Sequence, residues 1–269
     1  MANLTESWTP NVCFSASPTT LDLMTSLTRA DSLVISGEMA EVRAVKLEAT
    51  QRLLGSTMGI SDEQWQSASR LPGWTRAHVA THLARNADAM TTLVEALARG
   101  ERPPLYPSIS DRDREIERGS ERDGLALQID LDTSAGRLHE AFDRLVSFTD
   151  PVPVELAAGV VVDATQLPAV RLAEVLLHHV DLDVGYEIRD IPDQAARWLL
   201  EWVCFRLQHR PGTPAMRVVS ASGLSERIGG SGFATTIRGE DAALAGWLSG
   251  RGSADGLSGT DSIALPLLG

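Results

Sequence analysis

The stretch 169–184, AVRLAEVLLHHVDLDV, constrains the fold of this 269-residue chain more than any other. Its first ten residues are apolar on almost every side of a helical wheel, which is typical of a buried helix. Glu174 and His178 interrupt this surface four residues apart, so a helix stacks them on one face. A carboxylate buried without a partner either takes up a proton or pairs with a cation. The stretch therefore predicts a central helix that carries part of a metal site.

At least one further ligand has to come from elsewhere in the chain. A second long helix is expected over 76–99, entered through a Pro-Gly turn and capped by Thr75. His78 and His82 lie four residues apart on it, beside its apolar stripe. Either is a candidate for the missing ligand, and the spacing does not choose between them. Two histidines and a carboxylate with an open position are a usual set for catalytic zinc, and other divalent cations accept it too.

The remaining histidines favour structural interpretations. His179 lies on a different helical face from His178 and is expected to pack or to make a hydrogen bond behind the site. His139 and His209 have no companions and are interpreted as surface or structural residues. A histidine on a helix is more often a core residue than a ligand, so the metal hypothesis depends mainly on Glu174 in its apolar setting.

Composition excludes several classes of function. The formal net charge is -12, which argues against binding to the phosphate backbone of nucleic acids. Cys13 and Cys204 have no CxxC spacing and predict no disulfide framework, and Cys204 is expected to pack in the core. The chain has neither an apolar run of about 18 residues nor a signal-peptide pattern. We expect a cytoplasmic protein that binds neither membranes nor nucleic acid.

Periodicity and turn residues divide the chain into three parts. Residues 1 to about 30 lack a clear period, and residues 1–38 are interpreted as a leader, either disordered or preceding an alternative start at Met24 or Met39. Long helices are expected at about residues 31–58, 76–99, 125–148 and 167–184, which favours a metal-binding four-helix bundle over 39–186. A hairpin is expected at 154–162, and the charged segment 111–123 is interpreted as a solvated helical face or loop.

The pattern changes after Gly185. The elements expected there are a helix from about 191 to 207, strands at 216–220 and 234–238, and a short helix at 241–248 capped by Gly250. They predict a small α/β domain over 190–269. The predicted fold class is therefore α+β, mainly α.

Two motifs occur in a specific order, LPGWTRAHVATHLARN at 71–86 and RLAEVLLHHVDLDVG at 171–185. Together with REIERGS at 114–120 and SGRGSADGLSGT at 249–260, they resemble the mycothiol-dependent maleylpyruvate isomerase family from about residue 39 to the C-terminus. The resemblance implies a DinB-like metal-binding four-helix bundle joined to a small C-terminal α/β domain akin to sterol-carrier folds. It also implies zinc, or another divalent metal, and mycothiol as cofactors.

The resemblance assigns metal ligands by position. They are His82, Glu174 and His178, which makes His78 a flanking residue.

The resemblance further implies that Arg251, in the Gly-Arg-Gly sequence, is catalytic. A guanidinium suits a substrate carboxylate or a developing enolate oxygen. The alternative interpretation of Arg251 is a structural charge at a helix C-terminus, where it interacts favourably with the helix dipole. Asn86 and Asp181 are secondary candidates, for contact with thiol or substrate and for orienting a ligand. Trp74 is expected to anchor the helix entry rather than line the site.

The implied reaction converts maleylpyruvate to fumarylpyruvate in aromatic-acid breakdown through gentisate. A thiol on the metal loses its proton, and the mycothiol thiolate adds to the cis double bond. The adduct rotates about the resulting single bond, and elimination gives the trans product. An S-transferase acting on another electrophile would use the same residues and stays open, as does a non-enzymatic metal-dependent binding module. The implied partners are a small-molecule substrate and a low-molecular-weight thiol.

Overall fold

The computed structural model describes residues 32–269 except 158, 262, 264, 266 and 269. Most of the expected leader, residues 1–31, lies outside the described residues. The elements that follow are the helices α2 (Met39–Thr57), α3 (Asp62–Trp65), α4 (Arg76–Ala98), α5 (Ile109–Ser120), α6 (Gly124–Ala141) and α7 (Leu167–Asp181). A short hairpin of β1 (Pro153–Ala157) and β2 (Val160–Asp163) precedes α7.

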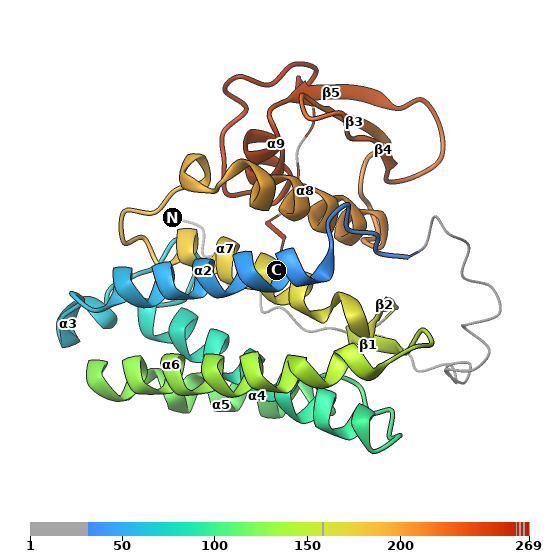
Figure 1. Cartoon of the computed structure of the whole chain (residues 1–269). Helices are drawn as coiled ribbons and strands as arrows, with labels where there is room; N and C mark the ends of the chain where they lie inside the picture. The colour runs from blue at the N-terminus through green and yellow to red at the C-terminus, as the bar shows by residue number, and fades with distance from the viewer. Residues whose placement is uncertain (1–31, 158, 262, 264, 266, 269) are drawn as a thin grey trace. The chain divides into compact units, whose positions relative to one another are not determined.

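Four long helices contact one another in a ring, in which α2 and α4 each touch both α6 and α7 (Figure 1). The helix α7 is buried along nearly its whole length, as its apolar sequence predicts. The likeness of these helices to a DinB-type bundle stays a prediction. Their packing places α4 and α7, the two helices with candidate ligands, directly against each other.

The entrance to α4 is held by a capping box. Thr75 Oγ1 accepts the backbone N–H of His78, while His78 Nδ1 accepts the backbone N–H of Thr75. These reciprocal bonds satisfy two amides at the helix start. The same contact turns the His78 ring back toward Thr75, whereas His82, one turn further along, faces α7.

The first long helix differs from the expected one. It begins at Met39 rather than near Asp31, because residues 32–38 are held in a non-helical conformation by tertiary contacts. A side chain at Gly37 would lie 2.4 Å from the Trp198 ring, and the Ser36 amide donates to Glu201. Tertiary packing thus overrides local periodicity at this helix start.

The C-terminal segment contains α8 (Asp193–Gln208), α9 (Asp241–Leu248) and a three-stranded sheet. Its strands are β3 (Met216–Ser220), β4 (Ser225–Ile228) and β5 (Thr235–Gly239), in the order β4-β3-β5. Strand β3 is antiparallel to β4 and parallel to β5. Strand β4 was not predicted, because its first three residues are exposed and its Glu226 has low strand propensity.

The helix α8 contacts α7 and also α9 and β4 (Figure 1). One cluster of buried apolar residues continues from α4 and α7 through α8 into the sheet and α9. The fold is therefore α+β and mainly α, as predicted. The expected boundary near residue 190 and the likeness to sterol-carrier folds stay predictions. In the described part of the chain, no helix combines the length and the hydropathy needed to cross a membrane.

Candidate metal centre

Two imidazoles and a carboxylate converge between α4 and α7. His82 Nε2 lies 3.1 Å from Glu174 Oε2, and His178 Nε2 lies 3.4 Å from the same oxygen. One ligand atom from each residue lies within 4.8 Å of the other two. The structure thus brings together the three residues predicted as metal ligands, two from α7 and one from α4.

The spacing of these atoms suits a single small cation. Ligands at about 2.0–2.1 Å from a tetrahedral centre lie roughly 3.3 Å from one another, close to both distances above. His82 and His178 are only 6% and 9% exposed. Two neutral imidazoles and one carboxylate leave a divalent cation with net positive charge. The residues present therefore fit the metal that the resemblance implies, without selecting zinc over similar cations.

Burial and hydrogen bonding set the charges of the triad. Burial lowers the pKa of His82 to about 4, so its ring is neutral at neutral pH, as a ligand must be. Burial alone would raise the pKa of Glu174, but hydrogen bonds with His178 and His82 outweigh it and hold this pKa well below its usual value. Glu174 is therefore an anion. For His178, hydrogen bonds to Asp181 and Glu174 likewise outweigh burial, and the pKa is raised.

Asp181 orients His178 from behind. Its Oδ2 lies 2.8 Å from His178 Nδ1. Because a carboxylate can only accept, Nδ1 carries a ring proton, so loss of the second proton would leave the lone pair on Nε2, the atom that faces Glu174. Burial acts to raise the pKa of Asp181, but the hydrogen bonds from His178 and Arg251 outweigh it and lower the pKa. This is the orienting contact expected of Asp181.

Arg251 is engaged mainly by the protein itself. Its Nε and Nη2 donate to the Asp181 carboxylate at 2.9 and 2.8 Å. Its Nη1 donates to the carbonyl oxygens of Ser249 and Leu268. Arg251 lies at the site, as predicted. The unexpected feature is that four of its five N–H groups donate to acceptors within the chain.

Arg112 is a site residue that the sequence analysis missed. Its Nη2 lies 2.9 Å from His82 Nδ1, and its guanidinium carbon lies 5.4 Å from the centre of the Tyr106 ring. It belongs to the charged segment 111–123, which was expected to be a solvated face or loop and is largely the helix α5. The helical spacing of Ile109, Arg112 and Ile116 after the cap Ser108 was the available signal, because it predicts an amphipathic helix with one face toward α4.

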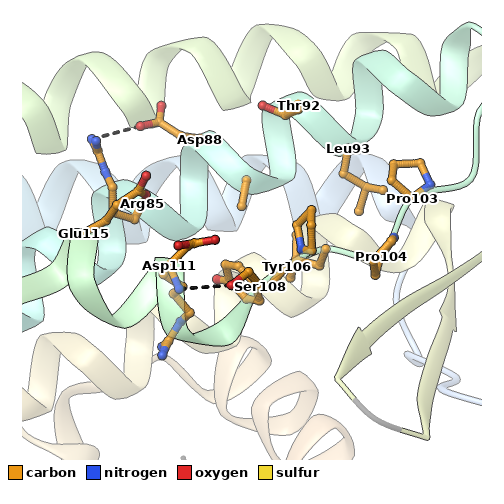
Figure 2. A pocket seen from close by; sticks show the side chains of 14 residues that line it. Arg85, Asp88, Thr92, Leu93, Pro103, Pro104, Tyr106, Ser108, Asp111 and Glu115 are labelled. Atoms are coloured by element: carbon orange, nitrogen blue, oxygen red, sulfur yellow. Dashed lines mark hydrogen bonds and ion pairs between the residues drawn. The ribbon is translucent and has the colours of Figure 1, made fainter.

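The triad lies at a cavity of about 450 Å³. Arginines 112, 206 and 251 also line this cavity, from α5, α8 and the loop after α9. Trp74 lines it as well, with its ring centre 5.6 Å from that of His82, so its position at the helix entry also makes it part of the site. A second cavity, of about 500 Å³, shares Leu105, Tyr106 and Arg112 with the first (Figure 2).

Asn86 lines the first cavity and also makes hydrogen bonds that position neighbouring side chains. Its Nδ2 donates to the Tyr106 hydroxyl at 2.9 Å, and its Oδ1 accepts from Arg171 at 2.7 Å. Arg171 is buried, and burial lowers its pKa to about 10. The side-chain amide of Asn86 is thus occupied on both sides by the protein.

The other predicted residues lie away from the triad. His179 stacks on Tyr186 and bonds Ser56, which is a packing role. His139 contacts Lys46, and His209 contacts the carbonyl of Phe205. Cys204 is buried, and burial raises the pKa of its thiol. None of these residues lines the cavity of about 450 Å³ that contains the triad, the metal-site cavity.

Together, the fold and the triad define a mainly helical protein with a candidate centre for a divalent cation between two packed helices. Residues 47–183, just over half of the chain, match the family described as the mycothiol maleylpyruvate isomerase N-terminal domain. The chain therefore belongs to this family.

Two solved structures share the fold. They are crystal structures of the mycothiol-dependent maleylpyruvate isomerase and of a histidine-to-alanine mutant of it. Each has a TM-score of 0.76 and 24% sequence identity, and the likeness covers 87% of this chain and 98% of the other. Comparison with curated proteins gives no match.

Proposed function

We propose that this protein is a mycothiol-dependent isomerase that converts maleylpyruvate to fumarylpyruvate. The observation that carries the proposal is the convergence of His82, Glu174 and His178 on one point of a cavity. Membership of the family supplies the thiol and the substrate class.

The triad would hold a divalent cation, zinc or a similar ion. When bound, such a cation supplies positive charge that stabilises the thiolate form of a thiol at neutral pH. The protein's part is to keep both rings in the ligating tautomer and to keep Glu174 ionised. For His178, the bond to Asp181 does this already.

His82 requires a local rearrangement. A guanidinium only donates, so the Arg112 contact places the His82 proton on Nε2, facing Glu174. A ring that ligates through Nε2 carries its proton on Nδ1 instead, and two donors would then face each other. Binding of a cation by His82 would therefore release the Arg112 guanidinium toward the cavity that it lines.

The cavity wall suits an anionic substrate. Arg112, Arg206 and Arg251 line it although the chain as a whole carries a net charge of -12. Released from His82, Arg112 would offer a planar fork for a substrate carboxylate. Arg251 would use its one remaining N–H of Nη2 for a substrate oxygen. This cationic wall favours an organic acid such as maleylpyruvate over an uncharged electrophile.

An assay with mycothiol and maleylpyruvate tests the proposal. We expect the purified, zinc-loaded protein to form fumarylpyruvate only when mycothiol is present, and the Glu174→Gln variant to be inactive. Chromatography with mass detection distinguishes the trans isomer from a thioether. A lasting thioether without the trans acid would replace the isomerase by the S-transferase. No turnover of maleylpyruvate with metal and thiol present would leave an S-transferase acting on another electrophile or the non-enzymatic binding module.

A further inference from the structure

A second group of arginines lies between α4 and α5, apart from the metal centre. They line a cavity of about 300 Å³ whose wall is made by Thr81, Arg85, Glu115, Arg118, Gly119 and Arg122. None of these six residues lines the metal-site cavity. Arg118 and Gly119 belong to the motif REIERGS, to which the proposed reaction gives no role.

Two buried donors in this wall have no acceptor. Thr81 Oγ1 and Arg85 Nε have no hydrogen-bond partner among the described residues. Thr81 is 1% exposed. Buried donors are almost always satisfied, because an unpaired one carries the full cost of its desolvation. Two of them at one cavity indicate an acceptor that the chain itself does not provide.

Gly119 allows α5 to approach α4 closely at this wall. A Cβ at this position would lie 2.3 Å from Thr81 Cγ2, 3.1 Å from Thr81 Oγ1 and 3.2 Å from Arg122 Nη2. Any other residue here would press on both the threonine and the arginine. The absence of a side chain at Gly119 therefore allows these groups to lie close together.

Arg118 differs from the other two arginines of the wall in its lack of an ion pair among the described residues. Asp130 accepts from both Arg85 and Arg122 at 2.7 Å. Arg85 also pairs with Asp88 at 2.9 Å, so carboxylates already offset the charge of these two arginines. Arg118 makes no ion pair within the described ranges and bonds the carbonyl of Arg114 through its Nε. Glu115 is the one acidic residue in the wall, and it lines the neighbouring cavity of Figure 2 as well, as does Arg85.

We propose that this cavity binds an oxyanion of the phosphate class. Its ligands are the Thr81 hydroxyl, Arg85 Nε and the guanidinium groups of Arg118 and Arg122. These donors come from α4, from α5 and from the turn that follows α5, so they approach the cavity from three segments of the chain. This arrangement suits a tetrahedral oxyanion better than a flat carboxylate. The bound anion would join α4 to α5, the helix that carries Arg112.

Calorimetric titration of the full-length protein with inorganic phosphate, at constant ionic strength, tests this site. We expect one saturable site per chain and weaker binding of acetate. Arg118→Gln and Thr81→Val should each weaken phosphate binding about tenfold, the effect of one charge-assisted or buried hydrogen bond. The matched control is Arg114→Gln on the same helix, which should leave binding unchanged because Arg114 does not line the cavity. Thermal unfolding of each variant checks that it is folded.

Two further titrations identify the chemical form of the anion and show whether it binds apart from the metal centre. Tighter binding of glycerol phosphate than of inorganic phosphate would mean that the anion is a phosphate ester, and the reverse that it is free phosphate. The metal-site variant His82→Ala should keep the binding, which separates this site from the metal centre. The proposal is overturned by an absence of saturable binding, by an equal loss in Arg114→Gln, or by a loss in His82→Ala alone.

Discussion

Arg251 donates two hydrogen bonds to the carboxylate of Asp181, a residue 70 positions earlier in the sequence. Both side chains are almost fully buried, at 3% and 1% exposure. Asp181 in turn accepts from His178, so the loop after α9 is tied to a candidate metal ligand through one carboxylate. The C-terminal segment thus contributes Arg251 to the hydrogen bonds that orient a residue of the candidate metal centre.

Replacing Asp181 by Asn should weaken metal binding. The amide keeps the shape but removes the charge that fixes the His178 tautomer, and it leaves Arg251 buried without an anion. Loss of such an orienting partner typically lowers metal affinity by about 10–100-fold, and breaking a buried ion pair costs about 3–5 kcal/mol of stability. Competition titration with a chelating dye and urea unfolding measure the two effects. An unchanged metal affinity would mean that Asp181 does not orient His178.

Replacing Arg251 by Gln should separate catalysis from metal binding. Asp181 still accepts from His178 in this variant, so metal content should stay near that of the parent. Loss of a charged donor at a substrate oxygen should lower kcat/KM about 10²–10³-fold. Steady-state kinetics beside elemental analysis check both parts. Full activity in this variant would remove Arg251 from the site.

Replacing Arg112 by Gln should strengthen metal binding while impairing turnover. The glutamine carbonyl can accept from His82 Nδ1–H, the tautomer that ligation needs, and the repulsion between guanidinium and cation disappears. We expect about a tenfold gain in metal affinity and a raised KM for the organic acid. Weaker metal binding would show instead that the Arg112 contact supports His82 as a ligand.

Because of Lys46, the free energy of unfolding should increase as the pH rises in the alkaline range. Burial, with the nearby charges of Arg171 and Arg43, lowers the pKa of Lys46 from 10.5 to about 8. The unfolded chain therefore holds this proton between those values while the native chain does not, so stability rises with pH from about 8 to 10.5 and the Lys46 contribution is constant below about pH 8.

The Lys46→Met variant isolates this effect. It should unfold at higher urea than the parent at neutral pH, by up to about 3 kcal/mol. The difference should vanish above about pH 10.5, where the lysine is neutral in both states. Equal stabilisation at both pH values would assign the effect to packing rather than to charge.

The candidate metal ligands of α7 were predictable because polar residues on an otherwise apolar helix are conspicuous. The choice of His82 over His78 was not, since both lie beside the same apolar stripe and only the family resemblance separated them. The capping box between Thr75 and His78 supplies the physical reason. Its three-residue spacing is visible in the sequence once His78 is considered as a capping partner.

Arg112 and the start of α2 could not be derived in the same way. The contact of Arg112 with His82 depends on how α5 packs on α4, and a segment dense in charge is usually solvated. The start of α2 depends on the contact of Gly37 with Trp198, which lies far along the chain. Both features arise from tertiary contacts, and local patterns do not contain them.

Elemental analysis of purified protein tests the metal centre most directly, with His82→Ala compared with its neighbour His78→Ala. Parent and His78→Ala should each carry about one divalent cation per chain, because His78 serves the helix cap and not the triad. His82→Ala should carry little or none. An unchanged metal content in His82→Ala, or a parent protein that binds no divalent cation when one is supplied, would contradict the proposed centre.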